Sequence, residues 1–436
     1  MQYLDVIQSG LDYIEANLKT TISAEELSLS AGFSVYHYYR LFQNITGMPV
    51  MQYVLRRRLL WAIYEIAEGK SQIEAALDYG FDTSAGFYKA FRREFGCSPS
   101  SYIKRYNIRK PFRIDLLKEK YLMITKKRIQ EILKNWNMPD AQIQSVVYPS
   151  GAVSENTFMV GKNYYIKAYT LPGKAQNNAE ILSALKDAGL SSGTWIPTRT
   201  GDTFVSDGEF SFLLTEKIDG QPLSVDKLFQ SIDDSLAYYL GQIIGQLHLV
   251  LQKNDQILCN ERNIFEEVRD QWLDPAKAAM NLSEDFCQEY LTVFADLHPS
   301  LPVQIIHRDP NPNNILLKDG ILSGFIDFEL SQRSIRLFDP CYAATGILVE
   351  SGAFDEPDSE KQQKWFQIFQ HIIHGYDDVI HLTESEKRAL PYVVFSIQLS
   401  CVGYFCGEEK FGDLSKINIK ILRWLLEHRK ELEFEE

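Results

Sequence analysis

Two short polar runs in the second half of the chain most strongly constrain its fold. The first is IIHRDPNPNNILL and the second, a few residues later, is GFIDFE. Together they place His307, Asp309 and Asn314 in an H-x-D-x-x-x-x-N spacing and add a second carboxylate, Asp327, between apolar residues. Phosphoryl transfer from a magnesium nucleotide needs a carboxylate to accept the proton of the acceptor hydroxyl, and carboxylate and amide oxygens to hold the metal. The pattern therefore predicts a kinase in this half of the chain.

An ordinary surface loop is the alternative, because Asp, Asn and Pro together are typical of turns. The flanking residues argue against it, since apolar runs enclose the polar loop on both sides. Such runs are typical of buried strands, and the polar spacing agrees with that of kinase catalytic loops. The flanking residues are Val303, Ile305 and Ile306 before the loop and Ile315, Leu316 and Leu317 after it.

The length and the cysteine pattern limit the class of protein. A chain of 436 residues with 45% hydrophobic residues is long enough for two or three domains. Its six cysteines are scattered, without the spacing of a zinc site or of a disulfide framework. The first residues are acidic with a helical period, unlike a signal peptide, and we expect no apolar run to approach a membrane span. These features predict a cytoplasmic protein with no membrane partner.

The charge is distributed unevenly along the chain. Residues 1–110 hold 13 Lys and Arg against 11 Asp and Glu, whereas the remaining residues hold 32 against 47. Such asymmetry indicates two modules with different partners.

The first hundred residues contain the same helical pattern twice. Ser23 and Glu26 form a capping-box pattern, and the helix that it starts ends at Gly32 before SVYHYYRLFQNITG. Ser71 and Glu74 repeat the capping pattern, and a second glycine turn precedes DTSAGFYKAFRREFG. A long amphipathic stretch, PVMQYVLRRRLLWAIYEIAEG, joins the copies. This order of short helix, glycine turn and second helix is the outline of a helix-turn-helix unit. Because the pattern occurs twice, a chance match is a poor explanation of it.

Residues 3–106 resemble the AraC/XylS family of transcription regulators, in which one long helix joins two helix-turn-helix units. The resemblance rests on a GF-(x)n-F-(x)4-G skeleton in both copies and on SPSSYIKR after the second. It implies that each second helix enters one of two successive major grooves of double-stranded DNA. The implied groove-facing residues are Tyr36, Tyr39 and Arg40 in the first copy and Ser84, Ala85, Tyr88 and Lys89 in the second, with Arg57, Arg92 and Arg93 placed for phosphates.

The second copy departs from a strong DNA-reading helix. Ala85 and Gly86 offer few groups for base recognition, and the glycine weakens the helix by roughly 1 kcal/mol. Sequence recognition therefore rests mainly on the first copy. A helical module that binds a protein instead of DNA is the alternative.

The segment that follows the helical region has the pattern of strand, turn, strand and helix. VYPSGAVSENTFMV surrounds Gly151 with small and polar residues whose amides could approach phosphates, although a plain hairpin explains it equally well. Lys167 lies between apolar neighbours in NYYIKAY, where an unpaired lysine is costly. Glu180, in the next predicted helix, is a candidate partner that would hold the ammonium against nucleotide phosphates.

These features, with the two polar runs, resemble the aminoglycoside phosphotransferase and choline kinase-like superfamily from about residue 125 to 425. The resemblance implies that Asp309 is the catalytic base, that His307 braces the loop, and that Asn314 and Asp327 hold Mg²⁺. It also implies that Lys167 contacts the phosphates with Glu180 beside it, that the adenine lies at the connector formed by Glu216 and Ile218, and that Asp339 is structural. Arg308 departs from the family, which usually has glycine there, and leaves the acceptor class open.

The predicted fold is multidomain: an all-α double helix-turn-helix domain followed by an α+β, bilobal, protein-kinase-like domain. We place the first domain at residues 1–108, a linker at 109–124 and the second domain at 125–436. The predicted function is a DNA-binding transcription regulator fused to a phosphotransferase that uses ATP (or GTP) and Mg²⁺ to phosphorylate a hydroxyl group of a small molecule. The acidic second region favours a cationic acceptor, and a homodimer is left open. The alternative is a regulator whose kinase-like domain only senses nucleotide or small molecule, without physiological turnover.

Overall fold

The computed structural model describes the chain apart from residues 1, 96, 106–107, 109, 112, 117–123, 148–152, 170–171, 192, 208–209, 231–233, 258, 356–357, 407–411 and 436. The chain forms two compact units. Unit one consists of Met1–Pro172 and Ile196–Lys217, and unit two of Gly173–Trp195 and Ile218–Glu436. The first strands after the helical region therefore belong to the same unit as that region.

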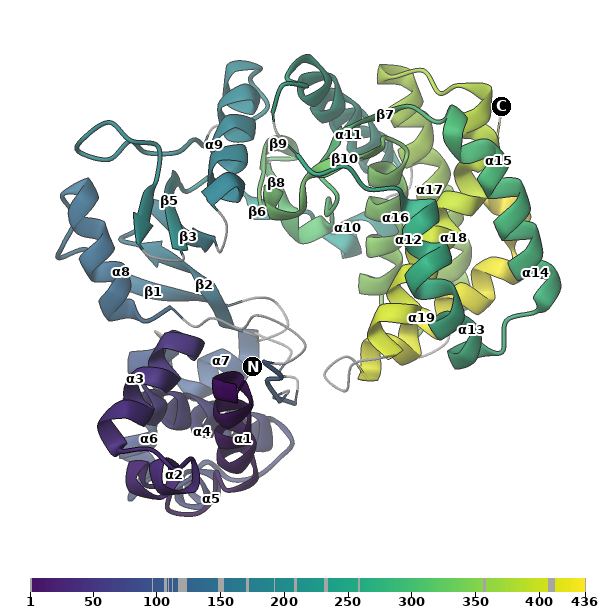
Figure 1. Ribbon diagram of the computed structural model, residues 1–436. Coiled ribbons are helices and arrows are strands. Elements are labelled where there is room, and N and C mark those ends of the chain that lie inside the picture. Colours follow the sequence, from purple (N-terminus) through teal and green to yellow (C-terminus); the bar gives the residue numbers. More distant parts are fainter. Residues whose placement is uncertain are drawn as a thin grey trace. The chain divides into compact units, whose positions relative to one another are not determined.

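Unit one begins with a helical module, which contains both expected helix-turn-helix copies (Figure 1). Gly32 and Gly80 form the turns of the two copies with φ of 70° and 76°, a left-handed conformation that glycine adopts without steric cost. The Ser23–Glu26 capping box is complete, whereas Ser71 caps its helix but Glu74 accepts from the Ser71 hydroxyl at 2.7 Å. The helices are α1 (Gln2–Ala16), α2 (Ala24–Ser30), α3 (Val35–Thr46), α4 (Val50–Ala67), α5 (Gln72–Asp78), α6 (Ser84–Phe95) and α7 (Pro99–Arg105).

The cores of the two copies repeat the same aromatic pair. In the first copy the rings of Phe42 and Tyr53 lie 5.8 Å apart, and in the second the rings of Phe91 and Tyr102 lie 5.2 Å apart. All four side chains are fully buried. The internal repeat in the sequence is thus a repeat of packing, with α4 as the shared helix.

Part of the segment expected to be a linker packs onto the helical module. Ile114 and Leu116 are buried in the module's core. The Gln8 side chain donates to the Ile114 carbonyl at 3.0 Å and accepts from the Leu116 amide at 2.7 Å. The chain is therefore fixed to α1 before it enters the sheet.

The sheet of unit one is antiparallel, with strand order β1-β2-β3-β5-β4. Helix α8 (Lys126–Ile132), capped by Thr125 as expected, packs its apolar side on this sheet together with the 3₁₀ turn Leu133–Trp136 (Figure 1). The strands are β1 (Ile143–Val147), β2 (Val153–Val160), β3 (Tyr164–Tyr169), β4 (Val205–Asp207) and β5 (Phe210–Glu216).

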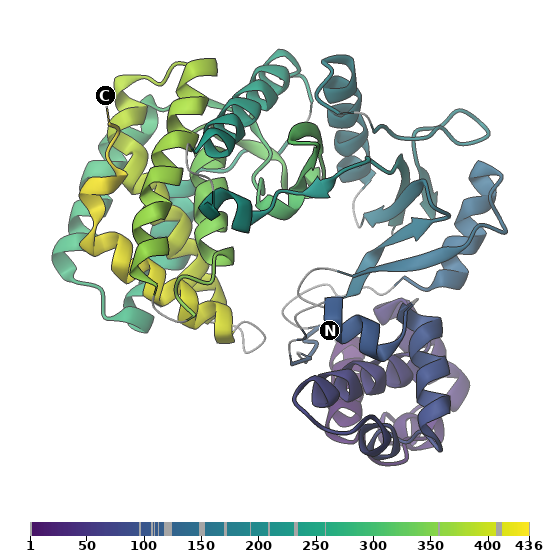
Figure 2. The same ribbon diagram turned by 180° about the vertical axis from the view of Figure 1, so that it is seen from behind.

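Unit two combines two small antiparallel sheets with many helices, so the expected α+β class is confirmed (Figures 1 and 2). The strands are β6 (Gln221–Pro222), β7 (Val303–Ile306), β8 (Ile315–Lys318), β9 (Ile321–Phe325) and β10 (Gln332–Ile335). The α-helices are α9 (Pro172–Asp187, which begins at the boundary of the units), α10 (Val225–Gln230), α11 (Ser235–Lys253), α12 (Ile264–Glu267), α13 (Leu273–Met280), α14 (Glu284–Glu289), α15 (Ala295–Leu297), α16 (Phe338–Glu350), α17 (Ser359–Val379), α18 (Glu384–Cys406) and α19 (Gly412–Glu427).

Helix α18 corrects the expectation that no apolar run approaches a membrane span. Within the described part of the chain it is the one helix long and apolar enough to cross a membrane by length and composition. In the fold, however, 72% of its most apolar window is buried against other helices. Its hydrophobicity is explained by a position in the core of unit two, which the sequence alone does not distinguish from a span.

Glycines allow α11 and α17 to cross at close range. A Cβ atom on Gly241 would lie 2.0 Å from the Ile372 carbonyl oxygen, and one on Gly375 would lie 2.0 Å from that of Tyr238. Because these neighbours are backbone atoms of the opposite helix, they cannot rotate away. The crossing therefore requires glycine on both helices.

We expect Gly241→Ala to lower the melting temperature of the full-length protein, since the added methyl group forces the helices apart at a cost of about 1–3 kcal/mol. Gly412→Ala is the matched control, because nothing lies within 4 Å of its Cβ position. Differential scanning calorimetry of both variants measures the effect. Equal melting temperatures for Gly241→Ala and wild type would contradict the close crossing.

Candidate active site and DNA-binding surface

The HRD-type loop and the GFIDFE segment are tied together through one residue, Ile326. The Ile326 amide donates to the Asn314 carbonyl at 3.0 Å. The His307 side chain donates from Nε2 to the Ile326 carbonyl at 3.0 Å, and its Nδ1 accepts from the Asp309 amide at 3.3 Å. His307 is completely buried. Its side chain therefore links the loop to the GFIDFE segment, and the bracing role implied for it stays a prediction.

Asp309 is held in place by two asparagine side chains. Asn314 Nδ2 donates both to the Asp309 carbonyl at 2.9 Å and to Asp309 Oδ2 at 3.0 Å, while Asn311 Nδ2 donates to Oδ1 at 2.9 Å. Burial raises the pKa of Asp309, and hydrogen bonds and the nearby His307 oppose this in part. The result is a fixed carboxylate of increased basicity, which suits a general base.

Asp327 follows the strand β9 at φ 65°, a left-handed conformation that Asp tolerates better than most residues. Its side chain is exposed, and its negative charge adds to the raised pKa of Asp309. Asn314 uses Nδ2 toward Asp309, so its amide oxygen is the atom that could face a cation. Asp327 and Asn314 thus provide hard oxygen donors of the kind that Mg²⁺ prefers.

Among the described residues, no group of three or more His, Cys, Asp and Glu side chains could hold a metal. A site built from Asn314 and Asp327 would therefore rely on oxygens from nucleotide phosphates and water as well. This is the usual situation for Mg²⁺, which is bound by one or two carboxylates together with substrate phosphates. The donor set fits Mg²⁺ with a nucleotide and does not fit a zinc site.

A buried carboxylate, Asp339, fixes the start of the loop. Asp339 Oδ2 accepts from the His307 amide at 2.7 Å, and Oδ1 accepts from the Arg308 amide at 2.9 Å. His248 Nε2 donates to Oδ2 at 2.9 Å, and its Nδ1 lies 2.7 Å from the Tyr376 hydroxyl. The implied structural role of Asp339 agrees with this network, and His248 belongs to it as a buried support from α11.

Arg308 occupies a position where the backbone favours glycine. Its φ is 74°, which explains why glycine is usual there. The guanidinium lies 4.0 Å from the centre of the Phe338 ring, and Nη2 lies 3.6 Å from Glu267 Oε2. Burial lowers the pKa of Arg308. The arginine is held inside unit two by α12 and α16, next to Asp309 in the chain.

Two functional candidates on α16 were missed in the sequence. Tyr342 forms a hydrogen bond with Asp309 that helps set the pKa of both groups. Glu350 accepts from Asn313 Nδ2 at 2.8 Å, and burial and the charge of Asp309 raise its pKa, although solvent at its exposed outer end screens part of this effect. They lie on a separate helix well beyond the loop in the sequence, so no local pattern indicates them.

The predicted nucleotide contacts are distributed over both units. Lys167 lies on β3 opposite Leu213, with its ammonium 5.6 Å from the centre of the Tyr169 ring. Glu180 lies on α9 and accepts from Gln176 at 2.7 Å. The pairing of Lys167 with Glu180 stays a prediction, because these residues belong to different units. Gly151 lies outside the described residues.

The two connector residues fall on either side of the division between the units. Glu216 ends β5 in unit one, and Ile218 begins unit two. Ile218 is buried, and a Cβ atom on Gly324 of the GFIDFE segment would lie 2.9 Å from its Cδ1 atom. Ile218 therefore packs directly on the segment that carries Asp327.

Most predicted DNA-contacting side chains are accessible on α3 and α6. Tyr36 is 72% exposed, and Arg40 lies over its ring at 5.8 Å. Tyr39 is half-buried and packs partly on the module's core, and Ser84 accepts from Gln72 at 3.0 Å. The exposed residues on α6 are Ala85, Tyr88, Lys89, Arg92 and Arg93.

Arg57 corrects one of these predictions. Its guanidinium is buried and forms a two-pronged ion pair with Glu15, from Nε at 2.5 Å and from Nη2 at 2.9 Å. The arginine faces α1 because α4 is buried on several sides as the shared helix of both copies. Arg57 therefore stabilises the helical module and cannot reach a phosphate.

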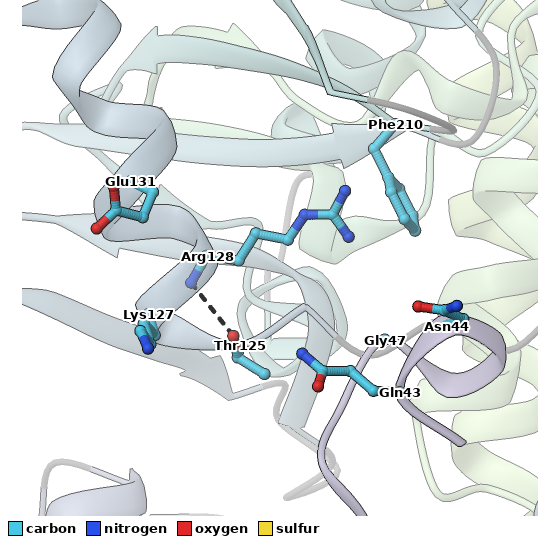
Figure 3. Close-up of a pocket in the computed structure, with 8 residues that line it drawn as sticks. All are labelled: Gln43, Asn44, Gly47, Thr125, Lys127, Arg128, Glu131 and Phe210. Atoms are coloured by element: carbon cyan, nitrogen blue, oxygen red, sulfur yellow. Dashed lines mark hydrogen bonds between the residues drawn. The ribbon is translucent and has the colours of Figure 1, made fainter. Parts of the chain in front are cut away.

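A hollow of about 580 Å³ lies within unit one where the end of α3 faces α8 (Figure 3). Figure 3 shows Arg128 extending toward Phe210, whose ring centre lies 4.7 Å away, with Gln43 and Asn44 on the α3 side. Arg128 also bonds to Asp207 from Nε at 2.9 Å. Arg128, which α8 presents to the hollow, is thus already engaged by Phe210 and Asp207. The described residues that line the hollow offer no evident reactive group.

Comparisons with known proteins agree with this architecture. The model of the helix-turn-helix domain family matches residues 27–105, and that of the phosphotransferase enzyme family matches residues 148–368. The HTH-type transcriptional activator AarP of Providencia stuartii is 37% identical over 98 residues, which are 22% of this chain and 73% of the relative. The regulatory protein SoxS of Salmonella typhimurium is 28% identical over 106 residues, 24% of this chain and 99% of the relative.

Among solved structures, a microcompartment-associated aminopropanol kinase superposes with a TM-score of 0.53 at 17% identity, over 70% of this chain and 98% of that protein. At this identity the likeness shows the fold alone. Together with the family matches, it means that this chain belongs to the phosphotransferase enzyme family and carries an AraC-type helix-turn-helix domain in its amino-terminal part.

Proposed function

We propose that this regulator–phosphotransferase fusion binds double-stranded DNA and transfers a phosphoryl group from ATP (or GTP), with Mg²⁺, to a hydroxyl group of a small molecule. The observation that carries the proposal is the fixed Asp309 carboxylate, which is half-buried, bonded to Asn314 and influenced by the charge of Asp327. A retired kinase fold has no need to hold these three groups together.

Each residue has a distinct part in the proposed transfer. Asp309 accepts the proton of the acceptor hydroxyl. The hydroxyl oxygen bonds to the terminal phosphorus of the nucleotide while the bond between that phosphorus and the leaving nucleoside diphosphate breaks. Asn314 and Asp327 would hold Mg²⁺, which when bound neutralises charge on the phosphate oxygens. Lys167, oriented by Glu180, would contact the phosphates, with the backbone around Gly151. The adenine would lie along Glu216 and Ile218.

The acceptor is proposed to carry a positive charge. Asp327 adds negative charge around Asp309, and the chain beyond residue 110 is strongly acidic. Such a surrounding attracts an amine and disfavours an anion. We further propose a cytoplasmic location and no membrane partner, in keeping with DNA as one ligand.

The DNA-binding half of the proposal rests on exposed side chains of α3 and α6. Tyr36, Tyr39 and Arg40 would read bases in one major groove, and Ser84, Tyr88 and Lys89 would contact the next. Arg92 and Arg93 would bind phosphates, which supply affinity without sequence information.

A second candidate function is a ligand sensor without physiological turnover. It is favoured by the compact association of the helical module with β1 and β2, which would let a bound ligand influence DNA binding. Steady-state assays of the full-length protein with magnesium–ATP and a panel of amino alcohols and amino sugars separate the two. Absence of turnover with retained nucleotide binding would favour the sensor.

We expect Asp309→Asn to lower kcat by about 10²–10⁴, because the base is lost while the side-chain shape is kept. In the wild type, kcat should rise with pH through a pKa above the ordinary 3.8 of Asp, since burial raises the pKa of Asp309 and only its ionised form accepts a proton. Asp319→Asn, a change in the exposed β8–β9 turn, is the matched control. Unchanged turnover by Asp309→Asn would sink the assigned role.

Arg92→Ala and Arg57→Ala should have different effects, the first on the affinity for DNA and the second on the stability of the helical module. Arg92→Ala is expected to weaken binding to all duplexes alike and to reduce the salt dependence by about one counterion, with an unchanged melting temperature. Arg57→Ala leaves Glu15 with the neutral donors Tyr53 and Trp61 but without its charged partner, and should destabilise the module by about 3–5 kcal/mol. Fluorescence anisotropy at several salt concentrations and thermal unfolding measure both effects; a stable Arg57→Ala variant with a reduced salt slope would reverse our assignment.

A further inference from the structure

A cluster of one buried and two half-buried charges joins the helical module to the first hairpin of the sheet in unit one. Arg56, on α4, is only 4% exposed. Its Nη1 lies 3.0 Å from Glu155 Oε2 on β2 and 3.9 Å from Glu94 Oε1 on α6. One guanidinium therefore connects the helix shared by the two DNA-binding copies, the second recognition helix and a strand of the kinase fold.

Further contacts hold the end of α6 against the same hairpin. Lys126 donates from Nζ to the Glu94 carbonyl at 2.8 Å and to the Arg93 carbonyl at 3.3 Å. A cation at this position also complements the negative end of the helix dipole. The Ser145 hydroxyl of β1 donates to the Glu94 carbonyl at 3.5 Å. The last turn of the recognition helix is thus fixed to β1 and to the first residue of α8.

The strand that carries Glu155 also pairs with β3, which carries Lys167, the predicted phosphate contact: Thr157 of β2 lies opposite Lys167. Val147 at the end of β1 pairs with Val153 at the start of β2, and both side chains pack against the core of the helical module. A change in the position of these strands would therefore alter the contacts of Arg56 and of the last turn of α6.

The two recognition helices are attached to the hairpin region differently. Helix α6 is held by ion-pair and hydrogen-bond contacts, whereas the end of α3 faces α8 across the hollow of about 580 Å³ (Figure 3). A shift of β1 and β2 would consequently move α6 more than α3. Because both helices must reach successive major grooves, their spacing determines whether DNA is bound by one copy or by both.

We propose that the cluster of Arg56, Glu155 and Glu94 couples nucleotide binding at Lys167, on the strand beside β2, to DNA binding by the helical module. The inference rests on the proposed function, since it takes the nucleotide site and the DNA surface from it. Linkage makes the coupling reciprocal: nucleotide alters the affinity for DNA, and DNA alters the affinity for nucleotide by the same factor. Ion pairs with a buried guanidinium suit this role, because they form only when the two elements that carry them lie in a narrow range of relative positions.

The test uses the full-length protein and measures the coupling factor twice: as the effect of nucleotide on the affinity for DNA, and as the effect of DNA on the affinity for nucleotide. The DNA probe is a fluorescent duplex selected from a random library by the protein itself, and the nucleotide probe is AMP-PNP with Mg²⁺. We expect AMP-PNP to change the Kd for the duplex by about 5-fold or more, a typical allosteric factor. Calorimetric titration of AMP-PNP with and without the duplex should give the same factor.

The decisive variant replaces the buried pair by apolar side chains of similar length, Arg56→Met with Glu155→Met, a change that folded proteins often tolerate. It should bind the duplex and AMP-PNP separately, with the coupling factor reduced to about 1. Glu131→Gln is the matched control, because it removes a carboxylate from an exposed ion pair with Lys134 on the same lobe. If circular dichroism shows that the double variant does not fold, Arg56→Lys, which keeps the charge but shortens its reach, is expected to reduce the coupling in its place.

The outcomes separate the inference from the proposed function. A wild-type protein that binds duplex and nucleotide with no mutual effect would overturn the coupling and leave the proposed function intact. Wild-type coupling that persists in the double variant, or in Arg56→Lys where that variant is used, would overturn the role assigned to the cluster. Failure of the wild type to bind AMP-PNP at all would remove the proposed nucleotide site and the coupling with it.

Discussion

The buried carboxylate of Asp339 is the interaction on which the candidate active site depends. It accepts hydrogen bonds from two consecutive backbone amides, those of His307 and Arg308, and from the His248 side chain. A buried carboxylate with several donors strongly specifies its surroundings, because each donor left without it would carry a desolvation cost. The loop can then adopt the left-handed turn at Arg308 and present Asp309 beyond it. Ile326 completes the arrangement by bonding to both ends of the loop.

Much of this organisation could be predicted from short-range sequence patterns. The spacing of His307, Asp309 and Asn314, and the twice-repeated glycine turns, are local signals whose physical meaning does not depend on the rest of the chain. The repeat in the helical module was especially informative, since the aromatic pairs Phe42–Tyr53 and Phe91–Tyr102 occupy equivalent places in the two cores. These predictions depend only on residue spacing and on the local conformation of the backbone.

The failures have a common physical cause, which is that burial is a property of the tertiary fold. Arg57 looked accessible among three successive arginines, but α4 is surrounded, so the side chain pairs with Glu15 inside the module. From a helix far along the chain, Tyr342 bonds to Asp309 and Glu350 bonds to Asn313, and no spacing rule connects them with the loop. The apolar helix α18 is buried in a helical core, and its composition alone could not show this.

The most direct test of the account concerns the oxygens proposed for the divalent cation. Electron paramagnetic resonance of Mn²⁺, titrated into the full-length protein with ADP, reports how much metal is taken up by the ternary complex. The account predicts tight uptake by wild type and a strong loss in Asp327→Asn, with Asp319→Asn unchanged. Equal uptake by wild type and Asp327→Asn would contradict a metal site at the end of β9, and with it the proposed phosphoryl transfer at Asp309.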